Sequence, residues 1–252
     1  MKKLLSIALC AAAVSAFADP TEVELGEVGV TAITTSFSNA IVAVSYDDLA
    51  GGSGMIVSNF VKTTNLTEGD QLAVFSNRTG TGGTYDTWVL RKNGSNVLYW
   101  EKNAKTYTVG SDGQLVEGTG VPASGITNAV GTGIWLVRQN PTDKDRNAIP
   151  FYIYGKPVDS EVSTAISGKW TLLGNPKQAA ATPTITGMAN GDTIQMPTER
   201  GMLNVYTYNK SLGKWTYWNE SNEPADTDAP EVPAGLGFWY VSTGEDSVTV
   251  EW

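Results

Sequence analysis

The 252-residue sequence contains no histidine and one cysteine, and these two counts restrict the chemistry open to the protein. Without histidine there is no Ser-His-Asp triad, no Cys-His dyad and no H-E-x-x-H zinc site. The single thiol, Cys10, lies close to the N-terminus. The groups that remain for chemistry are carboxylates, a serine paired with a lysine, and oxygen ligands for a hard cation.

Two patterns could place such groups together. Ser211 and Lys214 have the S-x-x-K spacing of penicillin-binding enzymes, in which the serine opens a helix and the lysine follows one turn later. Because this tetrad contains Gly213 and lies between two aromatic runs, we interpret it as a hairpin loop.

A glycosidase needs two carboxyl groups about 5 to 10 Å apart. Glu101 and Glu220 follow matching aromatic segments and are the best-placed acids, but no catalytic residue is predicted.

Two acidic segments have features of calcium loops. Residues 143–147 begin as D-x-D-x-N, but they lack the glycine and the glutamate that an EF-hand requires further along. A second segment carries Glu223, Asp226, Asp228 and Glu231 around two prolines. We interpret both as solvated acidic loops and predict no metal site and no cofactor, with calcium as the alternative.

The first 18 residues have the organisation of a secretory signal peptide. Lys2 and Lys3 precede an apolar run over 4–14, and Ala16-Phe17-Ala18 has the small residues of a cleavage site. The run is shorter than the roughly 20 residues that cross a bilayer. Cleavage would leave a chain without cysteine, so its stability must come from an ordinary hydrophobic core.

The formal net charge of −9 bears on the choice of partner. An acidic chain without a basic cluster repels phosphate backbones, which argues against nucleic acid as a partner. No later segment is long and apolar enough for a membrane helix, so membrane insertion is not expected. The sequence predicts a protein that is secreted or located at the cell surface or in the periplasm.

Short runs of alternating apolar residues predict an all-β protein. Glycine, asparagine, aspartate and proline separate these runs about every eight to twelve residues, which is the spacing of antiparallel strands and turns. We therefore expect two related antiparallel β units in tandem, each resembling a sandwich or a jelly roll. The predicted organisation is a signal peptide over 1–18, an N-terminal β unit with a leading strand pair over 19–157, and a C-terminal β unit over 158–252.

The two units are inferred from an internal repeat. Five segments match in the same order, and matches in a conserved order indicate duplicated structural units. The matched pairs are 56–60 with 172–176, 68–72 with 190–194, 85–90 with 203–208, 98–101 with 216–219, and 131–137 with 235–241.

The second copy carries a motif of its own. Residues 170–176 and 232–239 read W-x-L-x-G-N-P … P-A-G-x-G-F-W. This pattern resembles that of secreted and cell-surface β-repeat proteins of Gram-negative bacteria. The resemblance covers about the last 85 residues, where it implies an exterior location and a β-repeat architecture. In the first copy, Asn59-Phe60 replaces Asn-Pro and an insertion separates 121–123 from Gly131. The resemblance implies no catalytic residue.

Eight tryptophans provide the strongest indication of a binding role. Because successive side chains of a strand point to opposite faces, Trp215-Thr216-Tyr217-Trp218 and Tyr99-Trp100 cannot place all their rings in one core. The rings on the second face are either covered by another layer or exposed. Exposed Trp and Tyr rings stack on the apolar faces of sugar rings.

The sequence therefore favours an exported, non-catalytic protein that acts in adhesion, glycan binding or surface assembly. Its partner is predicted to be a glycan or a surface protein, with self-association as a further alternative. The predicted ligand-binding residues are Tyr99, Trp100, Tyr217, Trp218, Glu101 and Glu220. The alternative is a carboxylate-dependent hydrolase of extracellular polysaccharide, which would require an aromatic-lined cleft with two facing acids.

Overall fold

A computed structural model describes most of the C-terminal half of the chain and the strands of the N-terminal half. The described ranges are 28–35, 39–49, 54–56, 68–76, 84–92, 98–102, 105–109, 115–119, 127–137, 149–166, 169–197, 203–218, 223–244 and 247–252. The predicted signal peptide, residues 1–18, lies outside them.

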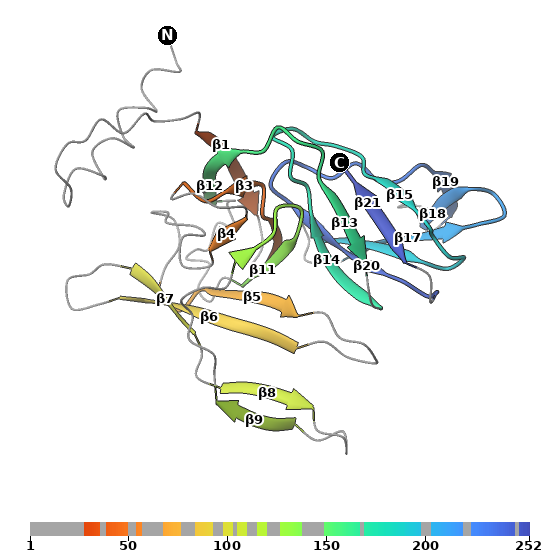
Figure 1. Ribbon diagram of the computed structural model, residues 1–252. Coiled ribbons are helices and arrows are strands. Elements are labelled where there is room, and N and C mark those ends of the chain that lie inside the picture. The colour runs from red at the N-terminus through yellow and green to blue at the C-terminus, as the bar shows by residue number, and fades with distance from the viewer. Residues whose placement is uncertain are drawn as a thin grey trace, which may run out of the picture.

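The described residues form strands and turns without a helix (Figure 1). The N-terminal set contains β1 (Gly29–Thr35), β2 (Asn39–Ala43), β3 (Tyr46–Asp47), β4 (Met55–Ile56), β5 (Gln71–Ser76), β6 (Thr84–Lys92), β7 (Leu98–Lys102), β8 (Lys105–Val109), β9 (Leu115–Thr119), β10 (Thr127–Asn128), β11 (Gly133–Val137) and β12 (Ile149–Pro157). The C-terminal set contains β13 (Ser163–Ile166), β14 (Trp170–Gly174), β15 (Thr184–Thr186), β16 (Thr193–Pro197), β17 (Leu203–Asn209), β18 (Lys214–Trp218), β19 (Pro224–Thr227), β20 (Gly237–Val241) and β21 (Val248–Glu251).

The same strand order occurs twice. The N-terminal set forms one sheet in the order β1-β12-β3 and another in the order β2-β11-β5-β6-β7. The C-terminal set forms β13-β21-β15 and β14-β20-β16-β17-β18-β19, so β19 extends the second large sheet. Strand pairs β4–β10 and β8–β9 add to the first unit. All these pairings are antiparallel, which confirms the all-β fold class of two related antiparallel units.

Each unit buries a core between its small and its large sheet. In the first unit, Ile33 of β1 and Ile153 of β12 pack with Trp88 of β6 and residues from β2, β5 and β11. In the second, Val250 of β21 packs with Phe238 and Tyr240 of β20. Both cores are built from alternate residues of their strands, because side chains of one sheet face recur every second residue.

Backbone hydrogen bonds confirm two of the five sequence matches. Gly69 N donates to Leu90 O, and Leu90 N donates to Asp70 O, both at 2.8 Å. The second unit repeats this arrangement, with Gly191 N on Tyr208 O at 2.9 Å and Tyr208 N on Asp192 O at 2.8 Å. The match of 131–137 with 235–241 is also confirmed, because β11 and β20 occupy the same place in their sheets.

The match of 56–60 with 172–176 is wrong. In the strand order, β14 corresponds to β2, and Ala43 pairs with Gly133 as Gly174 pairs with Gly237. The counterpart of 172–176 is therefore 41–45, which shares no motif with it. The leading strands β1 and β2 correspond to β13 and β14, so they belong to the repeat and are not an addition to it.

Reciprocal backbone contacts join the two units. Ala43 N donates to Gly235 O at 2.8 Å, and the equivalent Gly174 N donates to Gly131 O at 2.9 Å. Because each unit gives the other the same contact, an approximate two-fold axis relates them. Two isolated β-bridges also connect the units in a reciprocal way. Val42 of the first unit pairs with Leu236 of the second, and Thr132 of the first pairs with Leu173 of the second. In Figure 1 the junction lies at the centre, where β11 is beside β14 and β20.

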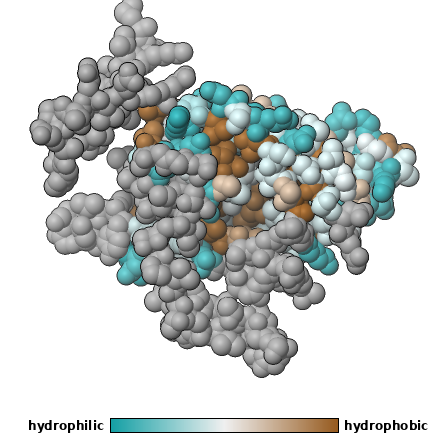
Figure 2. All heavy atoms as spheres, viewed as in Figure 1, coloured by the Kyte–Doolittle hydropathy of each residue, from teal (hydrophilic) through white to brown (hydrophobic). Residues whose placement is uncertain are grey.

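A third apolar cluster fills the junction. Ile41, Leu172 and Trp239 are buried there, with Phe75 and Trp135 packed against them. The ring centroids of Phe75 and Trp239 are 4.9 Å apart in an edge-to-face arrangement. In Figure 2 the apolar residues visible on this face gather in the middle of the molecule, between hydrophilic margins. The second faces of the two large sheets thus cover each other near the axis.

The glycine motif of the second unit belongs to this junction. A Cβ on Gly174 would lie 2.6 Å from both Ala43 Cα and Thr132 O, and a Cβ on Gly237 would collide with Leu173 O. The Asn175 side-chain amide donates to Val232 O at 2.8 Å and to Ala179 O at 2.9 Å. Gly174 thus allows the two units to approach each other, and the Asn175 amide joins two segments of its own unit, so the motif has a structural role.

Candidate functional site

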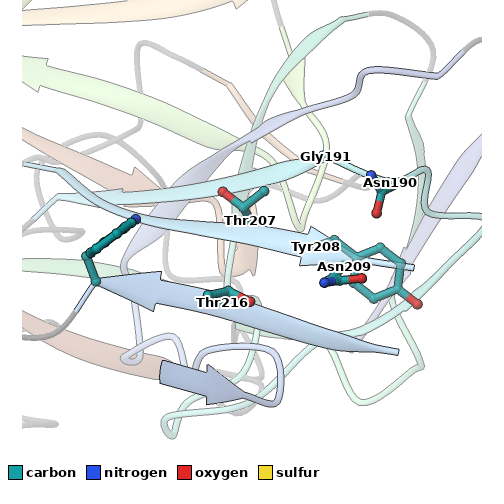
Figure 3. A pocket seen from close by; sticks show the side chains of 7 residues that line it. Asn190, Gly191, Thr207, Tyr208, Asn209 and Thr216 are labelled. Atoms are coloured by element: carbon teal, nitrogen blue, oxygen red, sulfur yellow. The ribbon is translucent and has the colours of Figure 1, made fainter. Parts of the chain in front are cut away.

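A shallow groove of about 330 Å³ lies on the face of β17 and β18 that points away from the core. Its volume falls at the small end of the range for ligand sites, roughly 300 to 1,000 Å³. Figure 3 shows Thr207 on β17 and Thr216 on β18, with Asn190 at the turn before β16. The lining residues are Asn190, Gly191, Thr207, Tyr208, Asn209, Thr216 and Trp218.

Strand alternation places Trp218 in this groove. In β18, Trp215 is 3% exposed and belongs to the core, whereas Trp218 is 63% exposed. The two differ by three positions, an odd number, so their side chains leave opposite faces of the sheet. Trp218 is the most exposed large apolar side chain among the described residues.

Tyr217 faces the core side and does not join Trp218. Its ring stacks on that of Tyr206, with centroids 5.3 Å apart. Burial, and then the proximity of Tyr217, raises the pKa of Tyr206 above its ordinary value. The pair is an aromatic stack on the face of the sheet opposite the groove.

Two asparagines present oriented amide groups at the groove. Asn190 Oδ1 accepts a hydrogen bond from Lys210 N at 3.0 Å. Asn209 Oδ1 accepts from Ser211 N at 3.1 Å and from Ser211 Oγ at 2.7 Å. Since a backbone N–H can only donate, these bonds fix which amide atom is oxygen. Neither Nδ2 group donates to an acceptor within the described part of the chain.

In contrast to the two asparagines, Thr216 presents a hydrogen-bond acceptor to the groove. Its hydroxyl donates to Asp226 Oδ1 of β19 at 3.1 Å, which leaves the oxygen lone pairs as acceptors. Nearby, Lys214 Nζ pairs with Asp228 Oδ1 at 2.6 Å. That hydrogen bond, with the charges of Asp228 and Asp226, raises the pKa of Lys214. Beside Thr216 the groove is thus bordered by acceptors and by a lysine that already has a partner.

Buried Asp192 holds the turn that carries Asn190. Its carboxylate accepts hydrogen bonds from Ala189 N at 2.9 Å, from the Tyr240 hydroxyl at 2.7 Å and from Thr243 N at 2.7 Å. Burial opposes ionisation of this carboxyl group, but the hydrogen bonds from Thr243, Tyr240 and Ala189 outweigh burial and lower its pKa. The turn is fixed to the end of β20, which positions one wall of the groove.

The other predicted site residues do not meet in one place. Trp100 is partly buried and packs against the core of the first unit. Glu101 is exposed and pairs with Arg91 Nε at 3.2 Å. The Tyr99 side chain and Glu220 lie outside the described residues.

The match between Trp100 and Trp218 is a register error. Leu90 pairs with Trp100, and the equivalent Tyr208 pairs with Trp215. Trp100 therefore corresponds to Trp215, and both point to their cores. The equivalent of Thr216 in the first unit is Glu101, so the outer face of that unit carries different chemistry.

Of the seven lining residues, sequence reasoning predicted only Trp218 and missed, among others, the polar residues Asn190, Thr207, Asn209 and Thr216. Asn190 lies in the repeat segment 190–194, but the repeat match gives no role to its side chain. Thr207 and Thr216 are directly paired across β17 and β18, and this pairing depends on a register that the sequence matches misplaced.

The S-x-x-K tetrad forms a turn, as the glycine had indicated. Ser211 Oγ donates to Asn209 Oδ1, whereas Lys214 Nζ pairs with Asp228. The two groups make their bonds with different partners, so they do not form a nucleophile–base pair. Within the described ranges, no three carboxylates come together as a metal site. Residues 143–147 lie outside those ranges.

Comparison with protein-family models, with curated proteins and with solved structures gave no match. In the part of the chain that the structure describes, no helix has the length and hydropathy needed to cross a membrane.

Proposed function

We propose that this chain is an exported, non-catalytic glycan-binding protein and that the groove of β17 and β18 is its binding site. The observation that carries the proposal is the exposed Trp218 ring beside two threonines and two asparagines. A flat ring with hydrogen-bonding groups at its side matches the two surfaces of a sugar, its apolar C–H face and its hydroxyl rim.

The physical basis is the contact between the indole face and pyranose C–H groups. The face of an aromatic ring carries partial negative charge and attracts the weakly positive C–H hydrogens. Thr207, Thr216, Asn190 and Asn209 then supply directional bonds to ring substituents. Small polar side chains on a rigid sheet hold their geometry better than side chains on a loop.

Location and partner class are part of the proposal. The N-terminal pattern of a charged pair, an apolar run and an Ala-x-Ala site supports export. The resemblance of 170–176 and 232–239 to surface β-repeat proteins supports the exterior of a Gram-negative bacterium. Adhesion to a glycan and assembly of a surface layer are the roles that fit this cellular location.

The alternative, a carboxylate-dependent hydrolase, gains less support from the groove. None of the described lining residues is an acid. Asp226 reaches the rim, where it accepts the Thr216 hydroxyl hydrogen bond. Hydrolysis by either stereochemical route needs two facing carboxyl groups, so one acid in a hydrogen bond supports binding rather than catalysis.

The test is a glycan array with the secreted form of the protein, followed by titration of any ligand found. Trp218→Ala should weaken binding by about tenfold or more, equal to about 1.4 kcal/mol, and should abolish part of the fluorescence change. The control is Tyr152→Ala, which removes an exposed ring of β12 in the first unit.

Equal loss in both variants, or binding unaffected by Trp218→Ala, would contradict the assignment of the groove. Silence across the array would refute glycan binding and favour self-association or a protein partner. Release of reducing sugar from a bound glycan would favour the hydrolase.

A further inference from the structure

The two asparagine amides bear on which glycans the groove accepts. This inference rests on the proposed function and concerns the same site. Asn209 Oδ1 accepts two hydrogen bonds, from Ser211 N and Ser211 Oγ, and Asn190 Oδ1 accepts one from Lys210 N. The two amides therefore offer a ligand both Nδ2 amino groups, which only donate, and a single remaining acceptor position on Asn190 Oδ1.

A ligand group that only accepts hydrogen bonds matches this end of the groove best. A sugar hydroxyl placed there would accept from an amide, but the two amides leave only one acceptor position, on Asn190 Oδ1, for hydroxyl hydrogens. A carbonyl oxygen has no hydrogen to place and can accept two bonds. Where the bound ligand excludes water, leaving a polar group unsatisfied costs more than a typical hydrogen bond gains, and this difference becomes selectivity.

Charge then selects among acceptor-only groups. Carboxylate and sulfate substituents are anionic, whereas an acetamido carbonyl is neutral. Asp226 lies at the rim with its Thr216 hydrogen bond, and Lys214 is already paired with Asp228. The formal net charge of the chain is −9, which further disfavours an anionic polymer.

We infer that the groove prefers saccharides that carry N-acetylamino groups, with an acetamido carbonyl accepting from Asn190 and Asn209 while a sugar face stacks on Trp218. Thr216, whose hydroxyl proton is engaged by Asp226, accepts from a ring hydroxyl between these two ends. Along the groove, the amide donors of the two asparagines come first, the Thr216 acceptor follows, and the Trp218 ring lies at the other end.

The experiment compares β-1,4-linked oligomers of equal length by isothermal titration calorimetry on the full secreted chain. The oligomers are those of N-acetylglucosamine, glucose, glucosamine and glucuronate, which vary one substituent or its charge. The expected result is that the N-acetylated oligomer binds about tenfold more tightly than the glucose oligomer, the value of one or two neutral hydrogen bonds.

Isosteric variants separate ligand recognition from structure. Asn190→Asp and Asn209→Asp keep an oxygen for Lys210 N or Ser211 N and replace the amino group with an acceptor. Each should remove most of the preference for the N-acetylated oligomer while thermal stability stays close to that of the wild type. If one variant does not fold, the other and the ligand series still decide the question.

The outcomes separate the two proposals. Equal binding of the glucose and N-acetylglucosamine oligomers, lost in Trp218→Ala, would overturn the acetamido inference and leave the proposed function standing. Tightest binding of the glucuronate oligomer would also overturn it, because an anion would then be the preferred acceptor. No binding of any oligomer, together with a silent array, would refute both.

Discussion

Asp192 holds the turn that forms one wall of the groove. Its buried carboxylate accepts hydrogen bonds from Tyr240, Thr243 and Ala189, and together they lower its pKa against the effect of burial. We expect Asp192→Asn to destabilise the protein by about 1–3 kcal/mol, because Asn cannot accept all these bonds. Urea denaturation at neutral pH measures this difference, and glycan affinity should fall in parallel.

The pH dependence follows from the direction of that pKa shift. A carboxyl group whose pKa is lower in the folded state contributes stability above its unfolded pKa, about 3.9, and loses it as the pH falls through the folded value. The stability gap between wild type and Asp192→Asn should be constant from about pH 5 to 7 and narrow below about pH 4. A gap that does not change with pH would show that the charge of Asp192 has no part in it.

At the scale of elements, β14 fits its neighbours only because Gly174 has no side chain. A Cβ there would lie 2.6 Å from backbone atoms of Ala43 and Thr132, which belong to the other unit. We expect Gly174→Ala to cost about 1–3 kcal/mol through overpacking. Chemical denaturation followed by circular dichroism measures the loss.

Gly213→Ala provides the matched control for that prediction. A Cβ on Gly213 would meet nothing within 4 Å, although its φ of 63° is unfavourable for alanine. We expect a loss of about 1 kcal/mol from backbone strain alone. If Gly174→Ala costs no more than this control, the junction is less tightly closed than its contacts indicate.

At the scale of the whole molecule, the two units share one apolar cluster across their axis. Trp239 is 5% exposed there and contacts Phe75 and Trp135 of the other unit. We therefore expect calorimetry to show a single unfolding transition, with equal calorimetric and van't Hoff enthalpies. Trp239→Ala should remove about 3–5 kcal/mol and separate the transition into two. Two transitions in the wild type would contradict the coupling of the units.

Much of the fold was predictable from the sequence because the signals are local. Alternating apolar residues and turn residues determine strands wherever they occur, and this predicted an all-β chain. Turn residues before β5 and β16 occur in both copies, so the repeat was detectable there. In contrast, 41–45 and 172–176 occupy equivalent positions with different residues, because buried strands need only apolar volume.

The site depended on the tertiary structure for a different reason. The sequence match made Trp100 equivalent to Trp218. The strand register instead makes Trp100 equivalent to Trp215, because their cross-strand partners Leu90 and Tyr208 occupy the same place in the two units. An error of three positions exchanges the two faces of a strand, because the side-chain period is two. Composition excluded histidine chemistry, and strand alternation indicated that some aromatic rings lie on a second sheet face. Pairing between distant strands decided that Trp135 and Trp239 are covered at the junction, while Trp218 faces the groove.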